Sequence, residues 1–424
     1  MAWCLPMEPE RPKSLRLANT LLALGLMFAL ALLYVWATYV FFTTRWLGGN
    51  DLFVVWRAVR AWLVEGQDPY SEAVTRTVQL EMLGRLAAPG EHQFGFAYPL
   101  GIALFIVPLL PVPFPLARAF WMVFLQGLVA LFVLASAWPR RLRPLELAAL
   151  VGATLLFYPT ARAIILGQPS VLITAAIAVV LWAVRVERDA LAGVALGLTT
   201  LKPQMSFLFV PAVLLWAWRA GRQRVWWGFG AASAALVLGP ALRFPAWPLS
   251  FLEAVRAYSA YTGGIQNAPL LILGEWLGPP ADTLLWWGGL FLVGGGLVWL
   301  HRRTAPDDQG ATERLFLWVL VLTTWIAWRT ATTNQIVGLL PLLAWWREGL
   351  KGRRFWAAMA VFLVVPWWVF LATLVGDAEQ PAAYLPVPLL SLVVLVAYER
   401  WGAANRPVAD VVGVPGTSNT VENA

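Results

Sequence analysis

Long apolar segments recur from one end of this chain to the other, separated by short polar or basic stretches. The chain is 60% hydrophobic and 13% charged, and a soluble protein of 424 residues cannot bury that much apolar surface. We therefore predict an all-α polytopic membrane protein. With about 20 apolar residues needed per span, we expect about twelve transmembrane helices, near residues 17–42, 115–138, 145–161, 168–184, 190–201, 204–218, 225–242, 281–300, 315–328, 334–346, 355–376 and 384–398.

The basic residues predict the orientation, because Lys and Arg are enriched in the cytoplasmic loops of membrane proteins. With the N-terminus inside, most basic clusters fall in inner loops, so we predict a multi-pass plasma-membrane protein with both termini cytoplasmic. The net charge of +8 then reflects topology rather than nucleic-acid binding. The inner clusters are Arg140, Arg141 and Arg143; Arg185 and Arg188; Arg219, Arg222 and Arg224; Arg302, Arg303 and Arg314; and Arg347, Lys351, Arg353 and Arg354.

This topology places one long loop, 43–114, and a second loop, 243–280, outside. Within the first loop we predict surface helices near 51–64 and 71–87, the former with apolar residues at helical spacing on one face. The segment 97–113 contains four prolines and is predicted to be re-entrant or interfacial. Residues 1–402 form the predicted transmembrane domain, and residues 403–424 a disordered cytoplasmic tail.

The scarcity of Cys and His excludes several kinds of site. Cys4 is the only cysteine, so no internal disulfide forms. His92 and His301 are the only histidines, and neither has the neighbours of a catalytic dyad. No second carboxylate forms an Asp-x-Asp pair with Asp51, so we expect no metal site and no cofactor.

Asp51 is the candidate catalytic residue. It follows Gly48-Gly49-Asn50 at the mouth of the first predicted span. An aspartate there can cap the following helix by accepting backbone N–H bonds. It can equally act as a general base that takes the proton of a substrate hydroxyl. The sequence leaves these two interpretations about equal.

Other polar residues lie at span ends on the predicted outer face, where ionisable groups are costly and need a reason. Lys202 either extends to the interface or binds phosphate, and the positive-inside rule favours the phosphate role. Arg329 opens a polar break that suits phosphate binding, although a hairpin tip would look similar. Arg162 and Gln168 bracket a tight turn for which a structural role is favoured. We assign Arg162 with Lys202 and Arg329 to the donor phosphate, and Gln168, Tyr98, Asn334 and Gln335 to substrate binding.

Several stretches together resemble glycosyltransferase family 87, the DUF2029 group, whose members have the GT-C fold and use polyprenol-phosphate sugars. The resemblance covers about residues 45 to 345. The matching stretches are Asp51-Leu-Phe-Val-Val-Trp56, Gly66-Gln-Asp68-Pro-Tyr70, Phe96-Ala-Tyr98-Pro99-Leu100, Leu166-Gly167-Gln168-Pro169-Ser170, and Leu191-Ala-Gly193 through Lys202-Pro203.

The resemblance implies that Asp51 is the base of an inverting transfer from a lipid-phosphate sugar, commonly mannose. It places Lys202 near the donor phosphate and makes loop 43–114 a pair of juxtamembrane helices that frame the acceptor groove. The chain departs from the family pattern at Leu100, where many members have a second proline. Asn334-Gln335 stands where many members have a histidine.

We therefore expect an integral membrane glycosyltransferase that moves a sugar to a glycan or glycolipid acceptor outside the cell. Two other functions stay open. A transporter or flippase of lipid-linked sugars would place its ionisable residues near the bilayer midplane and show repeat symmetry, and neither is evident here. A non-catalytic scaffold of envelope assembly would tolerate the change Asp51→Asn.

Overall fold

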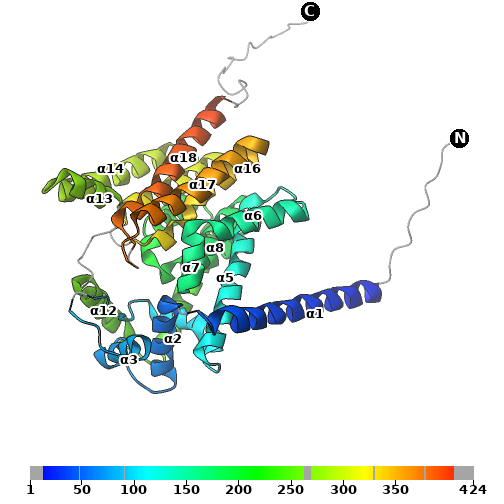
Figure 1. Cartoon of the computed structure of the whole chain (residues 1–424). Coiled ribbons are helices and arrows are strands. Elements are labelled where there is room, and N and C mark those ends of the chain that lie inside the picture. Colours follow the sequence, from blue (N-terminus) through cyan, green and yellow to red (C-terminus); the bar gives the residue numbers. More distant parts are fainter. Residues whose placement is uncertain are drawn as a thin grey trace, which may run out of the picture.

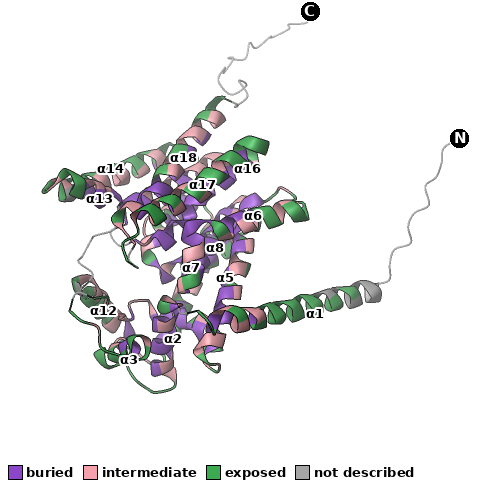
Figure 2. Cartoon of the chain, in the orientation of Figure 1, coloured by how far each residue is buried: buried purple, intermediate pink, exposed green. Residues whose placement is uncertain are grey.

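The computed structural model describes residues 13–46, 48–89, 91–261, 269–327, 330–376 and 379–404. In these ranges the regular structure is helical, which confirms the predicted class. The core lies among α5 (Phe114–Ala137), α8 (Ser170–Arg185) and the helices around them (Figures 1 and 2). The first helix, α1 (Lys13–Thr38), continues into a short π-helix at Tyr39–Thr43 and projects away from this core with most of its surface exposed (Figure 2).

Five helices in the described part of the chain are long and apolar enough to cross a bilayer. A sixth span is possible if α6 (Pro144–Leu156) and α7 (Tyr158–Leu166), which meet at 71°, act together. The predicted number of about twelve is therefore not confirmed. The five are Leu24–Thr43, α5 (Phe114–Ala137), Thr283–Arg303 in α14 (Ala281–Arg303), α17 (Gly352–Thr373), and Pro381–Ala404, which contains α18 (Pro386–Ala404).

The remaining predicted spans correspond to other helices. The 16 residues of α8 give a length of about 24 Å, less than the ~30 Å of a hydrocarbon core. The single span predicted at 145–161 is bent at Phe157, which has extended backbone angles ahead of Tyr158-Pro159. The helices found at the other remaining predicted spans are α8 (Ser170–Arg185), α9 (Asp189–Leu198), α10 (Phe209–Arg219), α11 (Gln223–Ala241), α15 (Gln309–Ile326) and α16 (Leu340–Glu348).

Helices α9 and α11 cross at very short range because glycines line the contact. A Cβ on Gly193 would lie 2.1 Å from the Val225 carbonyl oxygen, and one on Gly228 would lie 2.3 Å from that of Ala190. Small residues allow backbones to approach in this way in membrane helices. The crossing holds α9 in place, and α9 leads through Thr199–Leu201 to Lys202.

The two predicted outer loops come together at one end of the molecule, where Figure 1 shows α2 (Asn50–Leu63), α3 (Glu72–Leu83) and α12 (Trp247–Tyr261). A guanidinium of Arg243 donates to the Leu63 carbonyl at 3.1 Å. Both helices predicted in the first loop are thus present. The bilayer position of this end stays a prediction.

Helix α2 differs from its prediction as a surface helix with one apolar face, because most of its residues are buried inside the protein. Even Arg57 is buried, and its charge is neutralised by Glu65 at 2.9 Å and Glu81 at 3.2 Å. The Trp56 indole donates to the Leu109 carbonyl of the proline-rich segment at 3.2 Å. The proline-rich segment forms short helices at Leu100–Ile102, Ala103–Ile106 and Val107–Leu109. In the second outer loop, α12 is followed by α13 (Pro269–Leu277).

Candidate active site

The start of α2 is docked on the turn between α7 and α8. The Gly49 N–H donates to the Ile165 carbonyl at 3.0 Å, and the Trp121 indole donates to the Gly167 carbonyl at 2.9 Å. Gly167 has φ +74°, and a Cβ there would lie 2.5 Å from the Cβ of Leu52. Only glycine accommodates both that backbone angle and that approach. The turn therefore carries Gln168 directly against the first turn of α2.

Asp51 lies in the first turn of α2 and is not its N-cap. The N-cap position is Gly49, which offers no side chain for capping. The Asp51 side chain instead accepts from the Gln168 amide, with Nε2 2.7 Å from Oδ2. Its other oxygen makes no hydrogen bond to any residue that the structure describes. The capping interpretation is therefore wrong for this residue.

The Asp51 carboxyl is half-buried, and α2 is not among the candidate spans. Burial raises its pKa above the ordinary value, while the Gln168 hydrogen bond and the charge of Lys202 oppose that rise. A carboxylate with a raised pKa is a better proton acceptor than an exposed one. The Asp51 carboxylate is therefore a stronger base than that of an exposed aspartate.

Gln168 connects Asp51 to the other polar residues of the site. Its Oε1 accepts from the Tyr98 hydroxyl at 3.0 Å and from the Lys202 ammonium at 2.6 Å. A carboxylate only accepts hydrogen bonds and an ammonium only donates, so the amide must point its NH₂ toward Asp51 and its oxygen toward Lys202. The Asp51 carboxylate and the Lys202 ammonium are held one amide apart.

Lys202 is 3% exposed and does not extend toward the surface. Its ammonium also donates to the Ser170 hydroxyl at 2.6 Å, and that hydroxyl lies 3.0 Å from the Asn334 side-chain oxygen. The snorkelling interpretation is therefore wrong. Segments near residues 51, 98, 168, 202 and 334 meet in one hydrogen-bonded cluster, which we call the Asp51–Lys202 network: Asp51, Tyr98, Gln168, Ser170, Lys202 and Asn334.

Two predicted site residues take different partners. Arg162 pairs with Glu379, with Nη2 3.2 Å from Oε2, and also donates to the Tyr158 hydroxyl at 3.1 Å. Gln335 is fully buried, and its amide donates to the Tyr384 carbonyl at 2.8 Å, which is a structural contact. Arg329 lies outside the described residues. Across the described ranges, no three His, Cys, Asp or Glu side chains gather closely enough to hold a metal ion.

Comparison with known families shows what kind of protein carries this cluster. A family model described as glycosyltransferase family 87 matches residues 96–328, more than half of the chain. The chain belongs to glycosyltransferase family 87. It is therefore a membrane glycosyltransferase. A search of curated proteins found no match, and neither did a search of solved structures.

The family 87 match covers Tyr98, Gln168, Ser170 and Lys202 of the Asp51–Lys202 network. Asp51 and Asn334 lie outside the matched residues. Membership in family 87 confirms the resemblance seen in the sequence, while the contact between Asp51 and the matched region is a finding of the structure.

Sequence reasoning missed Glu379 and gave Ser170 no role. The Glu379 side chain is 6% exposed and also accepts from the hydroxyls of Tyr158 at 2.5 Å and Thr332 at 2.6 Å. It follows the apolar segment of α17, so the rule that identified Asp51, an acid next to a span end, would have found it. Ser170 is part of the Gly167-Gln168-Pro169-Ser170 stretch, but only the structure shows its contact with Lys202.

The contact between Gly167 and Leu52 leads to a first prediction. In Gly167→Ala, the added methyl would collide with Leu52 and force α2 away from Gln168. We expect a loss of about 1–3 kcal/mol in the free energy of unfolding, the usual cost of overpacking, together with a large loss of transferase activity. Thermal unfolding and transfer rate of the purified protein measure both.

The matched control is Gly127→Ala on α5, where a Cβ would meet no atom within 4 Å. We expect that variant to be as stable and as active as the wild type. Equal behaviour of the two alanine variants would contradict the proposed role of the Gly167 turn.

Proposed function

We propose that the protein transfers a sugar from a polyprenyl-phosphate donor to an acceptor hydroxyl, with inversion at the anomeric carbon and Asp51 as the general base. The observation that carries this proposal is the Gln168 amide, which holds a carboxylate and an ammonium side by side. Asp51, Gln168 and Tyr98 are half-buried, so substrate can reach them, whereas Lys202 is buried behind them.

In the proposed step, Asp51 takes the proton from the acceptor hydroxyl through its free oxygen. The acceptor oxygen attacks the anomeric carbon, and the bond from that carbon to the phosphate oxygen breaks. The polyprenyl phosphate leaves with the bonding electron pair. Inversion follows because attack comes from the face opposite the leaving phosphate.

Lys202 is the principal candidate for neutralising the charge that develops on the leaving phosphate. Fixed donors aimed at developing charge are among the largest contributions to catalysis. The Ser170 hydroxyl accepts from the ammonium and donates to Asn334, while Tyr98 and Gln168 supply hydrogen bonds to sugar hydroxyls. Arg162 and Arg329 complete the proposed phosphate contacts, with Arg162 first having to exchange its Glu379 partner. We leave Gln335 out of the substrate contacts.

We place the site on the extracytoplasmic face of the plasma membrane, with both termini cytoplasmic. The positive-inside bias of the basic clusters supports this orientation. A lipid-linked donor fits that face because nucleotide sugars are made in the cytoplasm. The donor enters from the outer leaflet, and the acceptor is a glycan or glycolipid.

The test is a transfer reaction in lipid nanodiscs with radiolabelled donors. Polyprenyl-phosphate-linked mannose, glucose and arabinose are compared with GDP-mannose, each with an oligosaccharide acceptor. We expect transfer from at least one lipid donor, none from GDP-mannose, and an inverted anomeric configuration in the product by NMR. Use of the nucleotide sugar alone, or a product with retained configuration, would rule out the proposed reaction.

A further inference from the structure

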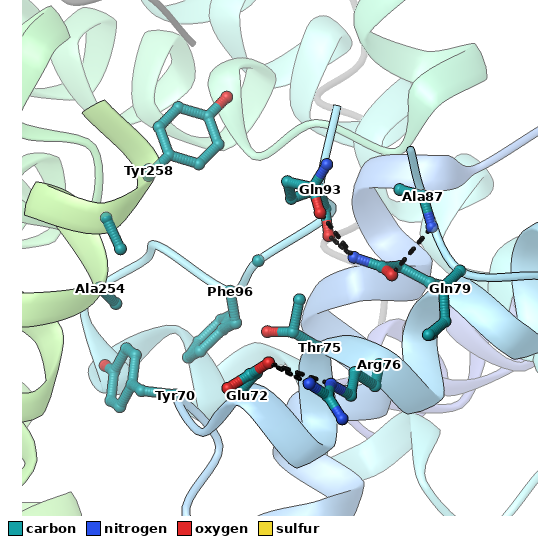
Figure 3. A pocket seen from close by; sticks show the side chains of 13 residues that line it. Tyr70, Glu72, Thr75, Arg76, Gln79, Ala87, Gln93, Phe96, Ala254 and Tyr258 are labelled. Carbon is teal, nitrogen blue, oxygen red and sulfur yellow. Dashed lines mark hydrogen bonds and ion pairs between the residues drawn. The ribbon is translucent and has the colours of Figure 1, made fainter. Parts of the chain in front are cut away.

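A cavity of about 510 Å³ lies between α3, residues 86–87 and 93–96, and α12 (Figure 3). Its volume is within the range of small-molecule sites, about 300–1,000 Å³. None of the residues of the Asp51–Lys202 network lines it. The cavity brings together the two predicted outer loops, because α3 belongs to the first and α12 to the second.

Aromatic rings form one part of the cavity. Tyr70 and Phe96 lie with ring centroids 5.0 Å apart at 32°, and Tyr258 of α12 lines the cavity beside them. Figure 3 shows these rings on the side of α12 and the amides of Gln79 and Gln93 on the other side. Apolar faces opposite a few polar groups are typical of sites that orient small molecules.

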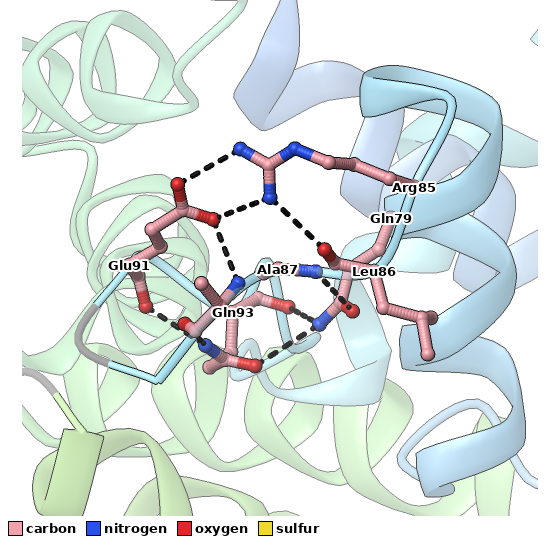
Figure 4. Close-up of polar contacts among 7 residues, drawn as sticks. Gln79, Arg85, Leu86, Ala87, Glu91 and Gln93 are labelled. Carbon is pink, nitrogen blue, oxygen red and sulfur yellow. Dashed lines mark hydrogen bonds and ion pairs between the residues drawn. The ribbon is translucent and has the colours of Figure 1, made fainter.

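Hydrogen bonds and an ion pair organise the polar side of the cavity (Figure 4). Gln79 is 4% exposed, donates to the Gln93 carbonyl at 2.8 Å and accepts from the Ala87 N–H at 3.0 Å. An ion pair of Arg85 with Glu91 at 2.8 Å closes the same loop. Such pre-organisation lowers the entropy cost of binding a ligand.

Hydrogen-bonding capacity remains on this wall. The Gln93 side-chain oxygen accepts one bond, from Gln79 at 3.2 Å, and a carbonyl oxygen can accept two. The Thr75 hydroxyl lines the cavity and makes no hydrogen bond within the described part of the chain. The cavity thus offers a free donor and free acceptors opposite aromatic faces.

The lining carries no net charge. Its two charged residues, Glu72 and Arg76, neutralise each other at 2.6 Å (Figure 3). A phosphate or an acidic peptide would find no unpaired cation here. A neutral ligand with both apolar C–H faces and hydroxyl groups fits this lining, and a sugar ring has this chemistry.

The cavity is adjacent to the Asp51–Lys202 network. Phe96 is two residues before Tyr98, and their rings lie 6.2 Å apart. The Tyr70 hydroxyl donates to the Tyr98 carbonyl at 2.9 Å, and the Tyr98 hydroxyl donates to Gln168, which binds Asp51. The cavity lining is therefore linked to the proposed base through Tyr98 and Gln168.

We propose that this cavity binds a neutral sugar ring of the acceptor, with its C–H face on Tyr70 and its hydroxyls on Thr75 and Gln93. The inference rests on the proposed function, since it assigns the chemical class of the acceptor. It makes the acceptor a glycan whose terminal hydroxyl reaches Asp51 while an inner ring occupies the cavity.

The test measures binding without transfer, in the Asp51→Asn variant and with no donor present. Saturation-transfer NMR is recorded with α-mannobiose, maltose and cellobiose, and with glycerol and a Ser/Thr-rich peptide as non-sugar probes. We expect saturation of at least one disaccharide and of neither non-sugar probe. Binding of the peptide instead, or of no disaccharide, would overturn the inference.

Variants then locate the binding. Ala257→Trp fills the cavity from an exposed position of α12 and is expected to abolish the saturation signal. Thr75→Val removes one hydroxyl and is expected to weaken binding about two- to tenfold, the effect of one neutral hydrogen bond. Ala73→Trp, an exposed α3 position that does not line the cavity, is the control and should bind like the parent.

The two proposals fail separately. Disaccharide binding that survives Ala257→Trp would overturn the cavity assignment and leave the transfer chemistry at Asp51 untouched. Loss of binding in Ala257→Trp, combined with no transfer by the wild type from any lipid donor, would support the sugar site and contradict the proposed reaction.

Discussion

Replacement of Asp51 by asparagine is expected to lower kcat about 10²–10⁴-fold, the usual contribution of a general base. The asparagine oxygen can still accept from Gln168, so the geometry of the network is retained while the proton acceptor is lost. KM for donor and acceptor should therefore change little. Initial rates at varied substrate concentrations measure both quantities.

Asp68→Asn is the matched control, because it makes the same chemical change in the same loop at an exposed turn. Asparagine also forms such turns, so we expect near wild-type rates. If Asp51→Asn keeps its activity within a factor of about ten, Asp51 is not the base.

Asp51→Asn should also be more stable than the wild type at neutral pH. Burial raises the pKa of Asp51 in the folded state, so the folded protein favours the protonated form over the ionised one. The contribution of Asp51 to the free energy of unfolding is fully present below the pKa that Asp51 has in the unfolded protein. It is lost as the pH rises through the pKa that Asp51 has in the folded protein. Asparagine avoids that loss, and thermal unfolding at pH 7 should show a higher midpoint than the wild type.

Replacement of Lys202 by methionine is expected to lower kcat about 10²–10³-fold, as for removal of one charge-stabilising donor in an active site. Methionine has a similar length and suits the buried position, but it cannot stabilise the leaving phosphate. Lys351→Met, at an exposed cation elsewhere, controls for the loss of positive charge.

The pH profile distinguishes this role from a merely structural one. Lys202 lowers the pKa of Asp51, so its removal should raise that pKa further. Activity requires ionised Asp51 and falls as the pH drops through its pKa, so the acid limb of kcat/KM should move to higher pH in Lys202→Met. A lower rate with an unmoved acid limb would place Lys202 outside the site.

Most of the network could be predicted from the sequence, because its members lie at the ends of apolar segments where polar residues need a reason. Asp51, Lys202 and Gln168 were found in this way. The rule gives positions along the chain and no contacts, so it put Arg162 with the phosphate-binding residues. The structure shows Arg162 paired with Glu379, more than two hundred residues further along the chain.

The number of spans was less predictable for a related reason. Hydropathy measures the length of an apolar segment and is insensitive to a bend such as that between α6 and α7. Hydropathy also did not show that α2, predicted as a surface helix, is mostly buried, with Arg57 neutralised by Glu65 and Glu81.

The sequence by itself determined that this protein is a helical membrane protein, because apolar segments of sufficient length have no other stable fold in lipid. Its resemblance to glycosyltransferase family 87, carried by the motifs, indicated the type of enzyme. The sequence also identified acidic, basic and amide side chains that are candidates for the site. Only the tertiary structure decided which of them meet. The turn at Gly167 brings Gln168 to Asp51, and that approach depends on the absence of one methyl group between two segments more than a hundred residues apart.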